Sequence, residues 1–219
     1  MRLKGFSHRT RRLYIGLLRR FYLARGGSHP RCSSEECRQW LVGFLDRGLS
    51  FSYVSQALSA IKLVHEQVLG CDSPVARIPR PREGKHLPTV LSRDEVKRLL
   101  DRLRYPKHRA VVLLLYSAGL RVGEAVRLRV EDIDSDRRVI HIRNGKGRKD
   151  RVVMLAAVAL DELRQYWRFE RPNKWLFPGE RRDRHLHPRT VQRAVARAAA
   201  EAGIRKRVTP HTLRHSFAT

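Results

Sequence analysis

The spacing of hydrophobic residues in the first third of the chain predicts three amphipathic helices. From Ser7 onward, leucine and aromatic residues recur one and four positions apart, which places them on one face of a helix. Ser33 followed by Glu36 is the sequence signature of a capping box, and it precedes a second apolar stripe. A third helix is predicted over residues 51–69. We therefore expect residues 1–72 to form a small helical domain.

Prolines separate this domain from the rest of the chain. Between residues 73 and 90 the prolines alternate with basic residues, and they are Pro74, Pro79, Pro81 and Pro88. Proline fixes the backbone torsion φ and has no N–H group, so this composition favours an extended segment that does not pack. We interpret residues 73–90 as a domain linker and residues 91–219 as a second domain.

The second domain is predicted to combine helices with a small sheet. Ser92 and Glu95 form another capping-box signature, and apolar patterns predict helices over 93–103, 107–117, 156–169, 188–202 and 209–219. Two β-rich runs, 139–142 and 151–155, flank a glycine-rich segment and predict a hairpin, and a short strand is predicted at 175–177. The predicted fold class is therefore mainly α with a small β-sheet (α+β).

The net charge of the chain indicates what class of molecule it binds. The 219 residues carry a formal net charge of +26 at pH 7. A coding bias toward arginine explains why arginine outnumbers lysine, but it does not explain the shortage of acidic residues. A protein this basic repels itself unless a polyanion binds it, and nucleic acid is the commonest one. We therefore expect a nucleic-acid-binding protein.

Two further features narrow the location and the chemistry. The longest apolar run, residues 110–116, is far shorter than the roughly 20 residues that span a bilayer, and the N-terminus has no apolar signal core. We expect a soluble cytoplasmic protein with no membrane partner. Cys32, Cys37 and Cys71 form no Cys-x-x-Cys pair, so free thiols are expected. A metal site formed by His29, Cys32 and Cys37 is the alternative, but no second ligand pair follows.

Four basic residues are candidates for a site. His211 and Arg214 lie three positions apart near the start of the last predicted helix, where free N–H groups favour an anion. Arg121 follows an apolar segment, in which a charge needs a carboxylate or phosphate partner, and Glu124 is an equally reasonable partner. Lys146 stands between two glycines at the predicted hairpin tip, where it either contacts another molecule or is simply solvated.

Taken together, the order of these motifs resembles the tyrosine recombinase (phage integrase) family. The segments that carry the resemblance are Ser117-Ala118-Gly119-Leu120-Arg121-Val122-Gly123-Glu124, Gly145-Lys146-Gly147 and His211-Thr212-Leu213-Arg214. It covers most of the chain, because the N-terminal helices and the proline-rich segment also look like that family's core-binding domain and linker. The resemblance implies a helical, SAM-like core-binding domain and a mixed α/β catalytic domain on opposite sides of duplex DNA.

The resemblance also implies a reaction. In the family, residues matching Arg121 and Arg214 hold the scissile phosphate, the one matching Lys146 protonates the leaving 5′ oxygen, and the one matching His211 assists proton transfer. Guanidinium groups donate paired hydrogen bonds to phosphate oxygens and neutralise the charge that grows in the transition state. No metal ion or other cofactor is implied.

The sequence departs from the family pattern after Arg214. The family's tyrosine nucleophile follows the His-x-x-Arg motif, whereas all six tyrosines of this chain precede it. We therefore expect a catalytic domain truncated at its C-terminus, a chain that is inactive alone, and impaired assembly of the family's homotetramer on DNA. The alternative is a non-catalytic DNA-binding module that occupies or regulates recombination sites. A basic RNA-associated protein would explain the charge but not the order of the motifs.

Overall fold

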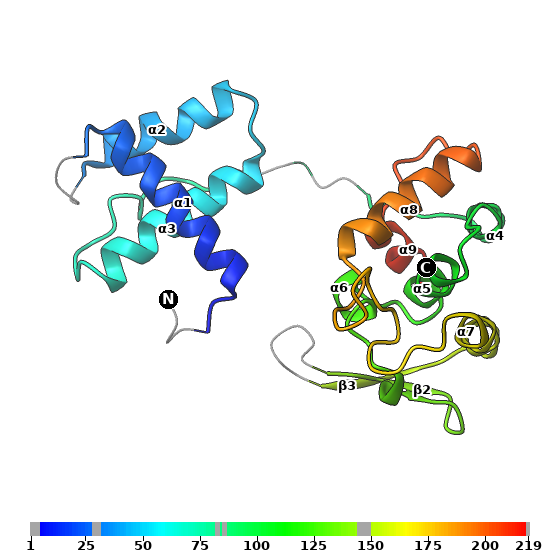
Figure 1. Cartoon of the computed structure of the whole chain (residues 1–219). Coiled ribbons are helices and arrows are strands. Elements are labelled where there is room, and N and C mark those ends of the chain that lie inside the picture. Colours follow the sequence, from blue (N-terminus) through cyan, green and yellow to red (C-terminus); the bar gives the residue numbers. More distant parts are fainter. Residues whose placement is uncertain (1–4, 28–31, 82–83, 85–86, 144–149, 218–219) are drawn as a thin grey trace. The chain divides into compact units, whose positions relative to one another are not determined.

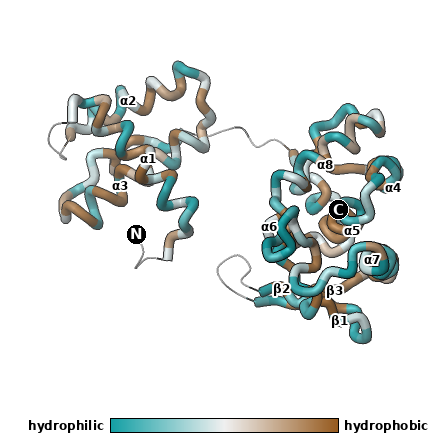
Figure 2. Tube along the Cα trace, viewed as in Figure 1, coloured by the Kyte–Doolittle hydropathy of each residue, from teal (hydrophilic) through white to brown (hydrophobic). Residues whose placement is uncertain are grey.

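The chain folds as two compact units, Met1–His86 and Leu87–Thr219. The computed structural model describes residues 5–27, 32–81, 84, 87–143 and 150–217 (Figure 1). Each unit has its own hydrophobic core, and hydrophobic and hydrophilic residues alternate along the helices of both units (Figure 2). Helices dominate both units and the second unit adds one small sheet, so the predicted mainly α fold class is confirmed.

Three helices form the first unit, and serine side chains mark where they begin. The helices are α1 (His8–Ala24), α2 (Ser34–Asp46) and α3 (Phe51–Gln67). Ser7, Ser33 and Ser50 each accept a hydrogen bond from a backbone N–H of the first turn. The helices α1 and α2 both pack against α3. Their shared core is apolar and contains Leu17, Phe21, Leu41, Phe44, Val54, Leu58 and Ile61.

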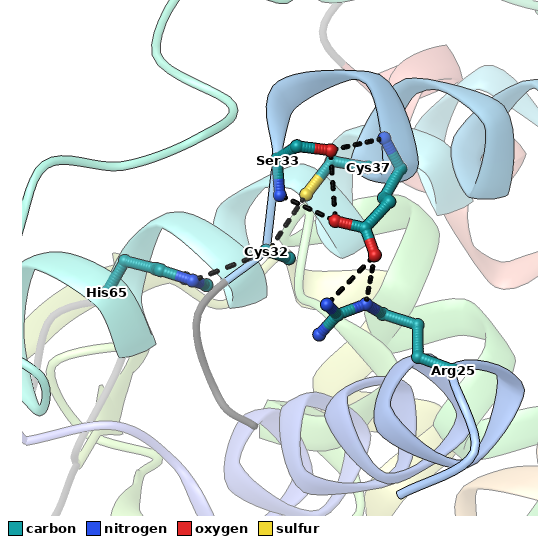
Figure 3. A network of polar contacts seen from close by, with 6 residues as sticks. Arg25, Cys32, Ser33, Cys37 and His65 are labelled. Atoms are coloured by element: carbon teal, nitrogen blue, oxygen red, sulfur yellow. Dashed lines mark hydrogen bonds and ion pairs between the residues drawn. The ribbon is translucent and has the colours of Figure 1, made fainter. Parts of the chain in front are cut away.

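The start of α2 is held by a network of polar contacts (Figure 3). The capping box is complete, because the Glu36 N–H donates to Ser33 Oγ at 3.2 Å and the Ser33 N–H donates to Glu36 Oε2 at 2.7 Å. Arg25, which follows α1, donates to Glu36 Oε1 at 2.9 Å. Cys32 and Cys37 occupy the two staple positions that flank the box, and their sulfur atoms lie 3.3 Å apart. The network joins α1 to α2.

The segment expected to be an unpacked linker, residues 73–90, begins inside the first unit. Val75 is buried in the core of that unit, and Ile78 packs against the same core. The Ser34 hydroxyl donates to the carbonyl of Pro74 at 2.5 Å. Residues 73–78 therefore differ from the expected extended segment, because the apolar side chains between the prolines have a core within reach.

The second unit is built around one buried helix. Its helices are α4 (Arg93–Asp101), α5 (Pro106–Ser117), α6 (Val122–Ala125), the short 3-10 helix η1 (Val130–Asp132), α7 (Ala157–Glu170), α8 (Pro188–Glu201) and α9 (Pro210–Phe217). Every residue from 110 to 115 of α5 is buried. Because α5 is apolar on all sides, it is packed against α4, α6, α7, α8 and α9. This helix fixes the relative positions of the others.

A three-stranded antiparallel sheet completes the second unit. It contains β1 (Ile133–Asp134), β2 (Val139–Ile142) and β3 (Arg151–Met154) in that order. The predicted hairpin of β2 and β3 is confirmed, with Ile140 opposite Val153, whereas its glycine-rich tip lies outside the described residues. The strand predicted at 175–177 is wrong, because Trp175 makes only an isolated bridge with Arg129.

Helix α9 is anchored on both sides within the second unit. Thr209 caps it as predicted, since the Thr212 N–H donates to Thr209 Oγ1 at 3.2 Å. Leu213 is fully buried in the core. The Ser216 hydroxyl accepts a hydrogen bond of 2.9 Å from the N–H of Leu91, which precedes α4. The last helix is therefore an integral part of the fold.

Gly119 allows α9 to lie close to the turn between α5 and α6. Its φ is +59°, a conformation that L-residues with a side chain rarely adopt. A Cβ atom at this position would lie 2.6 Å from Cδ1 of Phe217 on α9. Both the positive φ and the close approach of the Phe217 ring favour glycine at this position.

Candidate active site

A single buried carboxylate, that of Glu124 on α6, lies at the centre of a group of arginines. Only 6% of its side chain is exposed. Glu124 Oε1 accepts hydrogen bonds of 3.0 Å from Arg121 Nη1 and from Arg151 Nη1. Glu124 Oε2 accepts from the Arg121 backbone N–H at 2.9 Å and from Arg151 Nη2 at 2.8 Å. These bonds occupy the acceptor sites of both oxygens.

Arg214 on α9 reaches the same carboxylate without forming a hydrogen bond to it. Its Nη1 lies 4.0 Å from Glu124 Oε2, which is an ion pair but too long for a hydrogen bond. The same Nη1 atom is buried and has no hydrogen-bond partner in the described part of the chain. Burial lowers the pKa of Arg214, and the positive charge of Arg121 lowers it further. The Nη1 donor of Arg214 therefore lies beside the carboxylate without a hydrogen-bond partner in the described part of the chain.

The charges around Glu124 do not balance. Arg121, Arg151 and Arg214 carry three positive charges against the one negative charge of the carboxylate, and their side chains are 39%, 34% and 29% exposed. Burial by itself would raise the pKa of Glu124, but hydrogen bonds from Arg151 and Arg121 lower it to about 2. The carboxylate is therefore ionised and fully engaged, and the remaining positive charge suits an anion with several oxygen atoms.

His211 lies on the same face of α9, one turn before Arg214. Its imidazole ring contacts that of His215, with the ring centroids 4.5 Å apart. Burial lowers the pKa of His211 below its ordinary value, and His215, Arg214 and Arg121 lower it further. The lowered pKa favours the neutral imidazole, in which one nitrogen atom is able to accept a proton.

Comparison with known proteins assigns the chain to a family. A model of the phage integrase family matches residues 89–219, which is more than half of the chain. The chain belongs to this family. The tyrosine recombinase XerA of Thermococcus kodakarensis is 37% identical over 99% of this chain and 76% of its own length. XerA of Pyrococcus horikoshii is 33% identical over 100% of this chain and 75% of its own length.

Solved structures of phage integrase family proteins share the fold. A crystal structure of XerA recombinase is 30% identical, covers 98% of this chain and 78% of its own, and has a TM-score of 0.56. A crystal structure of a lambda integrase dimer bound to a core site is 19% identical, covers 98% of this chain and 80% of its own, and has a TM-score of 0.77. At that identity the second likeness shows the fold alone.

The structure brings together three of the four residues expected from the sequence of this phage integrase family member. Arg121 and Arg214 converge on Glu124, and His211 lies one turn from Arg214 on the same helix. Lys146 lies outside the described residues. The pairing of Arg121 with Glu124, which the sequence left open as an alternative to phosphate binding, is present at 3.0 Å. The pair leaves more than a third of the Arg121 side chain exposed.

Arg151 is the residue that sequence reasoning missed. It opens β3 and forms a two-bond ion pair with Glu124, 27 positions earlier in the chain. At the end of β2, Arg143 Nε lies 2.7 Å from Oδ1 of the buried Asp132. Both strands of the hairpin are therefore tied to the unit by arginine–carboxylate pairs next to the segment that contains Lys146. The available signal was a charged residue at the head of an otherwise apolar strand.

The described part of the chain contains neither a metal-binding cluster nor a membrane-spanning helix. Within the described ranges, no group of three or more histidine, cysteine, aspartate or glutamate side chains is placed to hold a metal ion. Of the alternative site that the sequence left open, Cys32 and Cys37 are described and His29 is not. Among the helices that the structure describes, none is long and apolar enough to cross a membrane.

Proposed function

We propose that this phage integrase family member binds duplex DNA and holds one backbone phosphodiester with Arg121 and Arg214 in site-specific recombination. The observation that carries the proposal is the guanidinium of Arg214, which is fixed beside an ionised carboxylate but makes no hydrogen bond to any other described residue. Unused donors in a site with excess positive charge match the oxygens of a phosphate group.

Each residue of the site then has a role in strand transfer. Arg121 and Arg214 bind the phosphate and neutralise the charge that develops on its oxygens in the pentavalent transition state. His211, whose lowered pKa favours the neutral imidazole, accepts or returns a proton near the phosphate. Lys146 protonates the leaving 5′ oxygen. Glu124, which is paired with Arg151, positions the side chains of Arg121 and Arg214 next to each other. Side chains of the chain itself therefore neutralise the charge on the phosphate and protonate the leaving oxygen.

The partner in this proposal is double-stranded DNA, bound as an assembly of several chains. The net charge of +26 supplies the long-range attraction to a polyanion. Two of the structurally similar proteins are a lambda integrase dimer on a core site and a lambda integrase tetramer on a Holliday junction. We infer that this chain also acts as a homo-oligomer on DNA.

The 219 residues, taken alone, are proposed to bind DNA without cleaving it. Every tyrosine precedes His211, whereas the family's nucleophile follows the His-x-x-Arg motif. The hydroxyl of Tyr166 is buried, donates to the Leu176 carbonyl at 2.9 Å, and has a pKa that burial raises. The hydroxyl of Tyr53 accepts a 2.7 Å hydrogen bond from Arg20. The second candidate is a module that occupies recombination sites without cutting them.

Phosphate-by-phosphate interference tests the proposal. A preferred duplex is first selected by repeated binding from a random pool, and single phosphates in it are then replaced by neutral methylphosphonates. In the unaltered chain, one replacement should weaken binding more than its neighbours do. In Arg214→Ala, that position should lose its effect, and overall affinity should fall by no more than the loss of this one phosphate contact, because many other cations remain. Arg164→Ala, an exposed arginine on α7, is the matched control and should keep the interference pattern.

Two outcomes would contradict the proposal. If binding is insensitive to salt, phosphate contacts do not drive it and both DNA-binding candidates fail. If Arg214→Ala and Arg164→Ala give the same interference pattern, Arg214 does not contact a particular phosphate. Both candidates predict that a nicked duplex traps no covalent adduct with the 219 residues, and an adduct would show that one of the six tyrosines is a nucleophile.

A further inference from the structure

The first unit contains a group of sulfur and imidazole atoms that the proposed DNA chemistry does not use. Cys32 precedes α2, Cys37 lies in its first turn, and His65 lies near the end of α3 (Figure 3). Cys32 Sγ is 3.3 Å from Cys37 Sγ and 3.5 Å from His65 Nε2. Cys32 is therefore the middle member of a three-residue contact chain that links α2 to α3.

The hydrogen bonds of His65 determine which of its nitrogens is protonated. His65 Nδ1 lies 3.0 Å from the carbonyl oxygen of Ile61. A carbonyl oxygen only accepts, so Nδ1 carries the proton and Nε2 presents its lone pair to Cys32. The imidazole is thus placed to accept the thiol proton of Cys32, which is the arrangement that activates a sulfur nucleophile.

The two thiols differ in access. Cys32 is partly exposed, whereas Cys37 is fully buried. Burial raises the pKa of both thiols, and the Arg25 guanidinium and the contact with Cys37 oppose this rise at Cys32. A dissolved reagent therefore meets Cys32 before Cys37. The third cysteine, Cys71, has its sulfur 3.7 Å from the backbone carbonyl of His65.

We propose that Cys32 and Cys37 form a redox-active dithiol that a small-molecule disulfide oxidises in the folded protein. Cys32 gives its proton to His65 Nε2 and attacks one sulfur of the small disulfide, which forms a mixed disulfide and releases a thiolate that takes that proton. The sulfur of Cys37 then attacks the sulfur of Cys32. The Cys32–Cys37 bond forms, and the second small thiol leaves with the Cys37 proton. The two protein thiols are oxidised and the small disulfide is reduced to two thiols.

The product is a covalent bond across the start of α2. The sulfurs lie 3.3 Å apart in the reduced protein and have to approach to about 2.05 Å in the bond. The new bond would join the residue before the capping box to the residue after it, and it would hold closed the end of α2 that Arg25 and Glu36 hold by an ion pair. Oxidation is therefore expected to raise the melting temperature of the first unit.

Peptide mapping of the folded 219-residue chain tests the proposal, with glutathione disulfide as the probe. Trypsin releases residues 32–38 as one peptide, because arginine stands at positions 31 and 38 and none stands between them. We expect this peptide to lose two hydrogens after exposure, and to regain them with a reducing agent. In Cys37→Ser, the second step is blocked, so a glutathione adduct should accumulate on Cys32. Cys71→Ser is the matched control and should oxidise like the unaltered chain.

The results that overturn the proposal are equally specific. If the native chain leaves the 32–38 peptide reduced, the contact between the sulfurs is a structural staple without redox chemistry. If the peptide is instead joined to the one that contains Cys71, the exchange follows a different pair. If Cys37→Ser collects no adduct while the unaltered chain oxidises, Cys32 is not the residue that reacts first. None of these measurements depends on DNA binding, so they stand apart from the proposed function.

Discussion

Replacing Arg151 by alanine should redirect Arg214 from the phosphate to the protein. In the structure, Arg151 supplies two of the four hydrogen bonds that Glu124 accepts. Arg214 Nη1 lies 4.0 Å from Oε2 of the same carboxylate. Once Arg151 is removed, the buried carboxylate of Glu124 has lost half of its hydrogen bonds. Arg214 has to move by only about 1 Å to form a hydrogen bond with it. Its donors are then no longer free for DNA.

The size of the effect follows from the bonds that are exchanged. A hydrogen bond to a charged group is worth about 1.5–3 kcal/mol. If Arg214 gives one such bond to Glu124, the interaction with the gripped phosphate should weaken about 10- to 100-fold. Arg151→Lys keeps the positive charge but cannot form the two-bond pair, so it should fall between alanine and arginine.

The assay is the methylphosphonate interference described above, applied to a set of four chains. Arg151→Ala should lose interference at the position that Arg214 controls. Glu124→Gln combined with Arg151→Ala should recover part of it, because a neutral amide does not attract Arg214. Arg164→Ala again serves as the surface control. If the double variant is as weak as Arg151→Ala alone, simple loss of charge explains the defect and the competition for Glu124 is refuted.

Three further predictions concern stability. Gly119→Ala should destabilise the second unit more than Gly203→Ala does, and the difference in unfolding free energy should be about 1–3 kcal/mol. Both glycines have positive φ, but only at Gly119 would a Cβ meet Phe217. Equal melting temperatures of the two variants would contradict this. The pKa of Glu124 is lowered to about 2 from 4.5, so its carboxylate stabilises the fold above pH 4.5 and this contribution is lost as the pH falls toward 2; urea titrations should show the gap between the unaltered chain and Glu124→Gln narrowing over that range. Asp132→Ala should cost about 1–3 kcal/mol, because it removes the buried carboxylate that accepts the Arg129 N–H at 2.8 Å and leaves this donor without a partner, whereas Glu131→Ala, which removes an exposed partner of Arg143, should change stability by less than about 1 kcal/mol in the same unfolding titration.

Local signals explain why most helices could be predicted. Capping boxes at Ser33 and Ser92 are pairs three residues apart, so the sequence alone contains both partners. The strand β1 was not predicted, since two residues are too few to show alternation. The predicted strand at 175–177 fails for a related reason: the Leu176 N–H donates to the Leu128 carbonyl at 2.8 Å, but the pairing does not continue as a ladder.

The site divides in the same way between local and distant signals. The His-x-x-Arg spacing predicted that His211 and Arg214 share a face of one helix, and the structure confirms it. The partnership of Glu124 with Arg151 spans 27 positions, and no periodic pattern reports a pair so far apart. Arg151 therefore looked like the polar start of a strand. The role of Lys146 stays a prediction from the resemblance to the family.

The anchoring of α9 means that shortening the chain from its end would not yield a folded protein that has merely lost its grip on DNA. Removing residues 210–217 takes away Arg214, but it also takes Leu213 out of the core and leaves the Leu91 N–H without its acceptor. The same helix therefore contributes both to the stability of the fold and to anion binding. A descendant that abandons phosphate chemistry has to do so by exchanging side chains on this helix, because deleting the helix would unfold the domain that carries it.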